Sequence, residues 1–267
     1  YKKLKSKTLN DIVSGKITYD KLDNILRADK EIVLEAIRHE SFVYYDVPEI
    51  LKDDREIVLA SLKKYGLMLE FVSDKLKKDR EIVFTAVKQC GFALKYADKI
   101  FKEDKEIVHE AIKSDGWALQ FVGSKFFRDP EFLFLAVKYH GYAFELLPKK
   151  YKKDKTFIEK CIKEHGYILR FIDPKLRLNY LFLEKLVKIN GYCLKYIPNE
   201  FKNDVNLALL AVKQNGLSIS FTEGDLRKNK EIIIEAIKQN RESYDFVDNS
   251  MKLDKDVSAA FMQYSMI

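Results

Sequence analysis

The chain has 267 residues, of which 47% are hydrophobic and 33% charged, a balance typical of a folded domain. No stretch approaches the ~18 consecutive apolar residues that a membrane-spanning helix needs, so no membrane span is expected. The 48 basic and 41 acidic residues give a net charge of +7, which favours anionic partners only weakly because the two signs are interleaved.

Three cysteines, an odd number, stand at unrelated spacings at Cys90, Cys161 and Cys193. This argues against a disulfide framework and against a CxxC metal site, and it suits a reducing, cytoplasmic compartment. Because the sequence begins at Tyr1 rather than Met, we expect a fragment or a processed chain, and any upstream secretion signal lies outside the sequence.

The organising feature of the sequence is a period of 25 residues without insertion. Residues 1–28 form a degenerate unit, in which Leu22 and Leu26 keep the apolar register, and we expect this unit to cap the N-terminal end of the array. From residue 29 onward every unit opens with an Asp or Asn, here called position 0, and both residue types are strong helix N-caps. Position 0 falls at Asp29, Asp54, Asp79, Asp104, Asp129, Asp154, Asn179, Asp204, Asn229 and Asp254.

The first helix of each unit is predicted to run for about eleven residues between position 0 and a glycine at position 12. Apolar residues at positions 3, 4, 7 and 8, such as Ile107, Val108, Ala111 and Ile112, form a helical stripe rather than a strand alternation. Position 7 is mostly Ala, which predicts close approach of a neighbouring helix. Position 12 is Gly in seven consecutive units, Gly66 to Gly216, and predicts a left-handed residue that ends the helix.

A second, shorter helix of about one and a half to two turns is predicted after the glycine, as in residues 117–122. Position 15 is usually Leu and position 17 usually aromatic, as at Phe121 and Tyr196, and we interpret the position-17 rings as a core ladder. Such a unit cannot bury its own apolar faces but can do so against like neighbours. The sequence therefore predicts an all-α solenoid of about ten tandem 25-residue helix–turn–helix repeats.

The array is expected to close with a single capping helix, from Asp254 to about Met266. The predicted organisation is one continuous solenoid domain, with a degenerate cap at residues 1–28, nine repeats at 29–253 and a terminal helix at 254–267. We expect the chain to be a monomer.

The pattern D-[KR]-E-[IV]-V-x-x-A-[IV]-K-x-x-G-x-A-L-x-[FY], which recurs over about residues 29–254, resembles a family of short tandem two-helix repeats described as a domain of unknown function. The resemblance implies the repeat architecture. It also implies a protein of the kind found in protists, giant viruses and intracellular bacteria, including secreted effectors that would act in a host-cell cytosol. It implies no activity and no catalytic residue.

Position 13 carries a column of aromatic side chains. Its run of four consecutive units, Trp117, Tyr142, Tyr167 and Tyr192, is the candidate partner-binding strip, because tyrosine hydroxyls need a polar outlet. The alternative is that these rings belong to the core. Since solenoids offer long surfaces, we expect a non-catalytic scaffold that binds a protein or peptide partner.

Position 9 is basic in nine consecutive units. Its central members, Lys88, Lys113, Lys138, Lys163 and Lys188, form a candidate polyanion-binding row. A second basic row occupies position 23. Binding of nucleic acid or another polyanion is therefore the alternative function, against the simpler interpretation that these cations offset the helix dipole.

Polar residues at position 11, among them Cys90, Asp115, His140 and His165, invite a metal site. Adjacent units should lie ~10 Å apart by helix packing, too far for ligands that converge on one zinc ion, so we interpret the column as polar helix ends. His109 is expected to be a half-exposed packing residue. The carboxylates at positions 0 and 2 recur in unit after unit, which is typical of a scaffold, and we expect neither an enzyme nor a cofactor.

Overall fold

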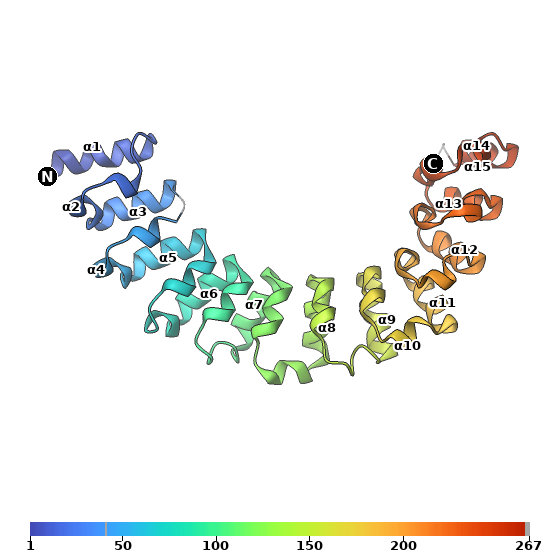
Figure 1. Ribbon diagram of the computed structural model, residues 1–267, viewed down its shortest axis with the longest axis horizontal. Helices are drawn as coiled ribbons and strands as arrows, with labels where there is room; N and C mark the ends of the chain where they lie inside the picture. Colours follow the sequence, from blue (N-terminus) through green and yellow to red (C-terminus); the bar gives the residue numbers. More distant parts are fainter. Residues whose placement is uncertain (41, 265–267) are drawn as a thin grey trace. The chain divides into compact units, whose positions relative to one another are not determined.

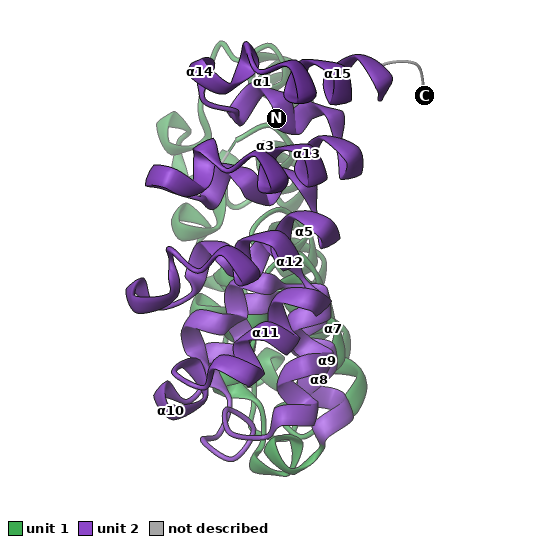
Figure 2. Cartoon of the chain, turned by 90° about the vertical axis from the view of Figure 1, so that its right-hand side faces the viewer, with its two compact units in different colours: residues 1–129 green, residues 130–267 purple. Residues whose placement is uncertain are grey.

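The computed structural model describes residues 1–40 and 42–264 of the chain (Figure 1). Within these residues every regular element is an α-helix or a 3-10 helix, and none is a β-strand. Equivalent helices follow one another at 25-residue intervals, so the chain is an all-α solenoid of tandem repeats, as the sequence predicts. It divides into two compact units, residues 1–129 and residues 130–267 (Figure 2). None of the described helices combines the length and apolar character that a bilayer crossing requires.

The α-helices of unit 1 are α1 (Lys2–Val13), α2 (Asn24–Arg27), α3 (Lys30–His39), α4 (Glu49–Lys52), α5 (Arg55–Lys64), α6 (Arg80–Gln89) and α7 (Lys105–Ser114). Its 3-10 helices are η1 (Tyr19–Lys21), η2 (Val43–Asp46), η3 (Gly66–Phe71), η4 (Leu76–Lys78), η5 (Gly91–Tyr96), η6 (Gly116–Phe121) and η7 (Ser124–Arg128).

The α-helices of unit 2 are α8 (Pro130–Tyr139), α9 (Lys155–Glu164), α10 (Pro174–Arg177), α11 (Tyr180–Ile189), α12 (Val205–Gln214), α13 (Lys230–Gln239), α14 (Asn249–Lys252) and α15 (Lys255–Gln263). Its 3-10 helices are η8 (Gly141–Leu146), η9 (Gly166–Phe171), η10 (Gly191–Tyr196), η11 (Asn199–Phe201), η12 (Gly216–Phe221), η13 (Gly224–Lys228) and η14 (Arg241–Phe246).

Each typical repeat has an α-helix at positions 1–10 and a 3-10 helix at positions 12–17, as α7 and η6 illustrate. The second helix has the predicted length but the tighter 3-10 geometry. Its buried residues lie at positions 12, 14 and 15, as Gly116, Ala118 and Leu119 show, and position 18, the residue that follows it, is buried as well. The predicted short connector carries a further helical turn in most repeats, for example α4 and η4.

The α-helices begin where predicted because the residue at position 0 caps them. The Asp104 carboxylate accepts hydrogen bonds from the backbone N–H groups of Glu106 and Ile107, at 3.0 Å each. The Asn229 side chain accepts the two equivalent bonds in α13. These bonds satisfy donors that the first turn of a helix leaves without an intrahelical partner.

The predicted apolar stripe forms the core. In α7 the side chains of Ile107, Val108, Ala111 and Ile112 are at most 1% exposed. Within each unit, successive α-helices of the repeats pack against one another, and so do successive 3-10 helices. An α-helix also contacts the 3-10 helix of the repeat before it, as α7 contacts η5. Each unit is therefore a row of α-helices beside a row of 3-10 helices, with the apolar core between the two rows.

The prediction of a left-handed glycine at position 12 is wrong. Among the described residues only Gly15, Gly224 and Phe42 have a positive φ. Glycine is needed at position 12 because the next repeat comes close: a Cβ at Gly91 would lie 2.1 Å from the carbonyl oxygen of Ala111, and three further position-12 glycines meet the equivalent carbonyl. The glycine at position 12 and the small residue at position 7 are thus two sides of one contact, which confirms the predicted close approach of helices.

The ends of the array differ from its middle. At the N-terminal end α1 packs against α3 and buries only Thr8 and Ile12. At the C-terminal end α15 packs against α13. The predicted end of this last helix near Met266 lies outside the described residues.

Candidate binding surface

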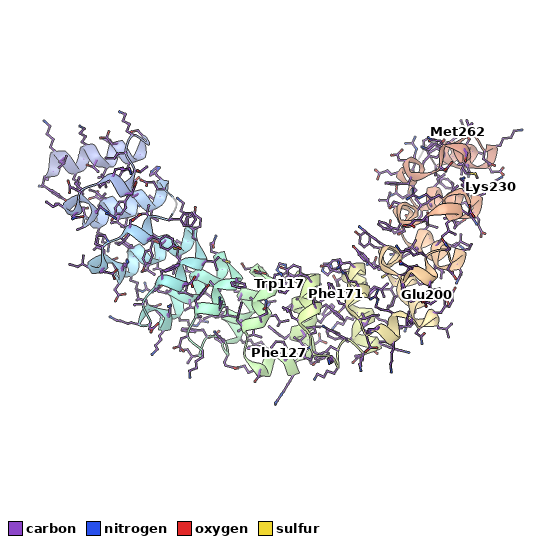
Figure 3. All side chains as sticks on the ribbon, viewed as in Figure 1. Trp117, Phe127, Phe171, Glu200, Lys230 and Met262 are labelled. Carbon is purple, nitrogen blue, oxygen red and sulfur yellow. The ribbon has the colours of Figure 1, made fainter. Side chains whose placement is uncertain are left out.

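One edge of the 3-10 row presents aromatic side chains to solvent. In unit 1, Trp117 lies at this edge and Phe127 at the opposite one (Figure 3). Trp117 at position 13 is 38% exposed and Phe71 at position 17 is 48% exposed. The prediction of a core ladder at position 17 is therefore wrong: its rings are half-buried or exposed, whereas positions 14, 15 and 18 are buried in most repeats. We call the side chains at positions 13 and 17 of the repeats the aromatic edge.

Rings of consecutive repeats touch along the aromatic edge, position 13 of one repeat against position 17 of the next. The ring centroids are 4.8 Å apart for Phe92 and Phe121, 6.5 Å for Tyr167 and Tyr196, and 5.0 Å for Tyr192 and Phe221. All three pairs meet edge to face, a geometry that aromatic pairs favour. The contacts hold the rings in place while leaving part of each ring exposed.

The four residues of the candidate partner-binding strip are divided between the two units. Trp117 lies on η6 of unit 1, whereas Tyr142, Tyr167 and Tyr192 lie on η8, η9 and η10 of unit 2, which pack in succession. The three tyrosines are half-buried. The Tyr167 hydroxyl would be 2.4 Å from a Cβ at Gly141, and burial raises the pKa of Tyr167. Part of the strip therefore packs between repeats, and part of it faces solvent.

Three rings of the aromatic edge face one ammonium group. The Lys195 Nζ atom lies 5.6 Å, 5.7 Å and 5.5 Å from the ring centroids of Tyr192, Tyr196 and Phe221. A hydrogen bond from the Tyr196 hydroxyl lowers the pKa of Tyr192, and burial together with this bond raises the pKa of Tyr196 to about 12. The distances to Lys195 are those of cation–π contacts, so these ring faces attract a cation.

Two grooves open along the aromatic edge, one in each unit. The N-terminal groove has a volume of about 530 Å³, and its walls include Phe42, Tyr45, Tyr65, Leu67, Glu70 and Phe71. The C-terminal groove has a volume of about 540 Å³, and its walls include Tyr192, Leu217, Phe221, Glu242, Asp245 and Phe246. Both volumes fall within the ~300–1,000 Å³ of typical ligand sites.

The grooves lie in the repeats in which position 13 is leucine, Leu67 and Leu217, rather than an aromatic residue. A leucine side chain fills less of the edge than a ring does. The sequence analysis above did not predict the grooves, although this interruption of the aromatic column is visible in the sequence.

The candidate polyanion-binding row is exposed at every member: Lys88, Lys113, Lys138, Lys163 and Lys188. Lys188 forms an ion pair with Glu184, one turn earlier in α11, at 2.7 Å. Arg38 and Lys238, outside the central group, pair with a glutamate of their own helix in the same way. The row therefore faces solvent with part of its charge offset by neighbouring carboxylates.

The second basic row, at position 23, is engaged in the fold. Lys77, Lys102 and Lys152 donate hydrogen bonds to the backbone carbonyl at position 16 of their own repeat, at 3.0 Å, 2.9 Å and 2.5 Å. Burial lowers the pKa of Lys102. These ammonium groups satisfy carbonyls near the C-terminal end of the 3-10 helix, where a cation is favourable.

A ladder of ion pairs between repeats was not predicted. The cation at position 1 bridges the carboxylates at positions 0 and 2 of the next repeat: Lys30 Nζ lies 2.9 Å from both Asp54 and Glu56. Arg55 and Arg80 make the equivalent bridges to the repeats that follow them. The residues that form the bridges are those of the recurring D-[KR]-E motif at positions 0 to 2, so the sequence contained the information needed to predict them. Each bridge is at the surface, so it contributes little to stability by itself.

Position 11 provides polar groups at helix ends, as predicted. The Asn190 side chain accepts a hydrogen bond from the Tyr192 N–H at 3.0 Å and donates one to the Ile162 carbonyl at 2.9 Å. The His165 Nε2 atom lies 3.1 Å from the carbonyl oxygen of Lys138. In the part of the chain that the structure describes, no group of His, Cys, Asp and Glu side chains is arranged to hold a metal ion.

The three cysteines and His109 differ in burial. Cys161 and Cys193 are buried, as predicted, and burial raises the pKa of both thiols, to about 12 for Cys161. Cys90 is half-buried beside the N-terminal groove. His109 is half-buried on α7.

The model of one protein family, Domain of unknown function (DUF4116), matches the chain in six segments: residues 54–102, 79–127, 104–151, 129–177, 179–227 and 206–252. Most segments span two successive 25-residue repeats, and together they cover most of the chain. The match confirms the tandem-repeat resemblance and assigns no activity. No curated protein and no solved structure matches the chain.

Proposed function

We propose that the chain, which belongs to the DUF4116 family of unknown function, is a non-catalytic scaffold that binds a protein or peptide partner along its aromatic edge. The observation that carries the proposal is the exposure of the rings at positions 13 and 17. Positions 14, 15 and 18 are buried in most repeats, whereas the rings at positions 13 and 17 keep part of their surface exposed to solvent.

Two further features support this role. Half-exposed aromatic rings held by their neighbours are typical of binding surfaces, since they provide a large contact area at a low cost in side-chain entropy. Contiguous apolar patches on a protein surface commonly mark interaction sites. In the N-terminal groove, Phe42, Tyr45, Leu67 and Phe71 are all 45% exposed or more.

The proposal is tested by selecting peptides from a random phage-displayed library on the immobilised chain and measuring their affinity by fluorescence polarisation. The double variant Tyr192→Ala/Phe221→Ala removes two walls of the C-terminal groove, and peptides that bind there should bind it roughly tenfold more weakly or worse, as expected for aromatic interface anchors. The matched control is Leu181→Ala, because Leu181 is 76% exposed but lies at position 2, beside the N-cap. Selected peptides that bind neither groove, or a library that yields no binder, would overturn the proposal.

A second function, polyanion binding through the position-9 row, is favoured by the exposure of all its members. Its test is binding of a single-stranded DNA of roughly 20 nucleotides at ~50 mM salt and above, compared between the chain and the variant Lys138→Gln/Lys163→Gln. A steep fall of log K with log salt, and a smaller slope in the variant, would support it. No binding at ~50 mM salt would remove it.

A further inference from the structure

We propose that the C-terminal groove takes a peptide segment that places a basic side chain, arginine or lysine, between apolar residues. This rests on the proposed function of the aromatic edge and names the chemistry of the partner at one of its sites. Two properties of the groove carry it: the aromatic and aliphatic side chains of its walls, and the two carboxylates that line it.

The walls suit the apolar parts of such a segment. Tyr192, Leu217 and Phe221 are half-buried, and Phe246 is 45% exposed. Tyr192 and Phe221 meet edge to face at 5.0 Å, so their positions are held before any partner arrives. A site formed in advance avoids part of the entropy cost of binding.

The same rings already hold a cation on the side of the preceding repeat. Tyr192 and Phe221 face Lys195, at position 16, with its Nζ atom 5.6 Å and 5.5 Å from their centroids. The equivalent Lys95 of unit 1 also lies over rings of its own 3-10 helix. Where position 16 is lysine, the chain thus supplies a cation to the aromatic edge itself.

In the C-terminal groove position 16 supplies no cation. The residue there is Ser220, whose hydroxyl donates a hydrogen bond to the Leu217 carbonyl at 2.7 Å. In the next repeat position 16 is Asp245, which lines the same groove. Residues of the groove's own repeat and of the next one therefore add no cation to the one that Lys195 of the preceding repeat places near Tyr192 and Phe221.

Two carboxylates make the groove complementary to a basic side chain. Glu242 and Asp245 both lie on η14, both are exposed, and neither forms an ion pair within residues 1–40 and 42–264. Of the nearby basic residues, Lys195 faces Tyr192 and Phe221, Arg241 stacks over Phe261 at 4.5 Å, and Arg227 donates to backbone carbonyls of the preceding segment. An arginine entering the groove could meet both the rings and a carboxylate, which are its two favoured kinds of contact.

The overall charge of the chain works against this preference. With a net charge of +7, long-range attraction favours acidic peptides. A preference for a basic peptide would therefore have to come from the groove itself, which makes the proposal easy to separate from a general electrostatic effect.

The test uses the whole chain and three fluorescein-labelled peptides that are identical except for Arg, Gln or Glu between two leucines. We expect the Arg peptide to bind roughly tenfold more tightly than the Gln peptide, the size of one favourable cation–π or charge-assisted contact, and the Glu peptide to bind most weakly. In Glu242→Gln/Asp245→Asn the preference for Arg should disappear, while the affinity for the Gln peptide should stay within about twofold of that of the unaltered chain.

The matched control is Asp225→Asn/Glu231→Gln, which changes the net charge equally at two exposed carboxylates outside the groove walls. It should keep the preference for Arg. Suppose that all three peptides bind the unaltered chain equally and that Tyr192→Ala/Phe221→Ala binds none of them. This result would overturn the basic-partner proposal but would still support the aromatic edge as a binding site. The proposal would also be overturned if Glu242→Gln/Asp245→Asn and Asp225→Asn/Glu231→Gln lost the preference for Arg equally, because the preference would then depend on net charge rather than on the groove. If none of the three peptides binds, both proposals fail at this groove.

Discussion

The contact between repeats at Gly91 is tested by the substitution Gly91→Ala. The new Cβ would lie 2.1 Å from the carbonyl oxygen of Ala111 and 2.9 Å from the backbone nitrogen of Asp115. Both are backbone atoms of the next repeat and cannot rotate aside as a side chain can. The Gly91 N–H also donates to the Ser114 hydroxyl at 3.0 Å, so separating the repeats would weaken a hydrogen bond as well.

The magnitude follows from the size of the overlap. The two repeats must separate by about 1 Å to restore an ordinary carbon–oxygen contact, in a core packed as densely as a crystal. Overpacked sites typically cost ~1–3 kcal/mol, and a clash with backbone belongs at the upper end of that range. Alanine also lowers the conformational entropy of the unfolded chain, which stabilises the fold by about 0.4–1 kcal/mol. We therefore expect the free energy of unfolding to fall by about 2 kcal/mol in total.

The assay is urea unfolding followed by far-ultraviolet circular dichroism, with whole curves compared because repeat arrays can unfold in more than one step. Gly123→Ala is the matched control in the same unit. The three atoms nearest its Cβ would all belong to the carboxylate of Glu103, the end of a flexible side chain that is 47% exposed. We expect this control to change the free energy of unfolding by less than about 0.5 kcal/mol.

Equal unfolding curves for Gly91→Ala and Gly123→Ala would refute the close-approach argument. Gly91→Asn adds a second criterion, because asparagine tolerates a left-handed backbone much better than alanine does. If Gly91 were needed for a left-handed turn, Asn would be the milder substitution. If the Cβ contact decides, Asn must destabilise the chain at least as much as Ala.

Two further predictions concern charge and thiol chemistry. The Arg55 guanidinium holds the pKa of Asp79 below its usual range, so this pair stabilises the fold above the unfolded carboxyl pKa of ~3.9 and its contribution is lost as the pH falls through the lower folded value. Between neutral and acidic pH the urea midpoint should therefore fall more for the unaltered chain than for Arg55→Met. The difference should be small because the pair is at the surface, and parallel curves would contradict the ladder. With a chromogenic disulfide reagent, Cys90 should react in the folded chain whereas Cys161 and Cys193 should react only after unfolding, and equal rates would contradict their burial.

The α-helices could be predicted because their signals are local. An aspartate at position 0 and apolar residues at positions 3, 4, 7 and 8 lie within three turns of one helix, and Asp104 with Ile107 and Ala111 behaves as this pattern indicates. The period of 25 residues repeats the evidence in unit after unit, so the architecture follows with little ambiguity.

The errors arose where one residue type has two uses. Glycine serves both for left-handed backbone and for close approach, and the carbonyl that requires Gly91 belongs to Ala111, in the next repeat. The position-17 rings were assigned to the core by counting 3.6 residues per turn from position 13, whereas the segment is a 3-10 helix and these rings are half-buried or exposed. The bridge from Arg55 to Glu81 likewise joins residues of different repeats, which a pattern within one unit does not show.

A last prediction separates scaffold from binding site. The strip of Trp117, Tyr142, Tyr167 and Tyr192 follows the repeat, and a periodic feature can be explained by packing between repeats, as the contact of Tyr167 with Gly141 illustrates. The grooves instead lie where leucine interrupts the aromatic column.

Leu217→Tyr would extend the aromatic column by one repeat beyond Tyr192 and fill the C-terminal groove. We expect the binding of peptides selected for this groove to weaken roughly tenfold, because the lost contacts are those of an interface core. The free energy of unfolding should change by less than about 1 kcal/mol, since the equivalent positions of the two preceding repeats, Tyr167 and Tyr192, accommodate a tyrosine at the same half-exposed edge. The reciprocal variant Tyr142→Leu controls for the loss or gain of a ring elsewhere on unit 2. Unchanged peptide binding by Leu217→Tyr, with the fold intact, would show that interruption of the column has no part in recognition.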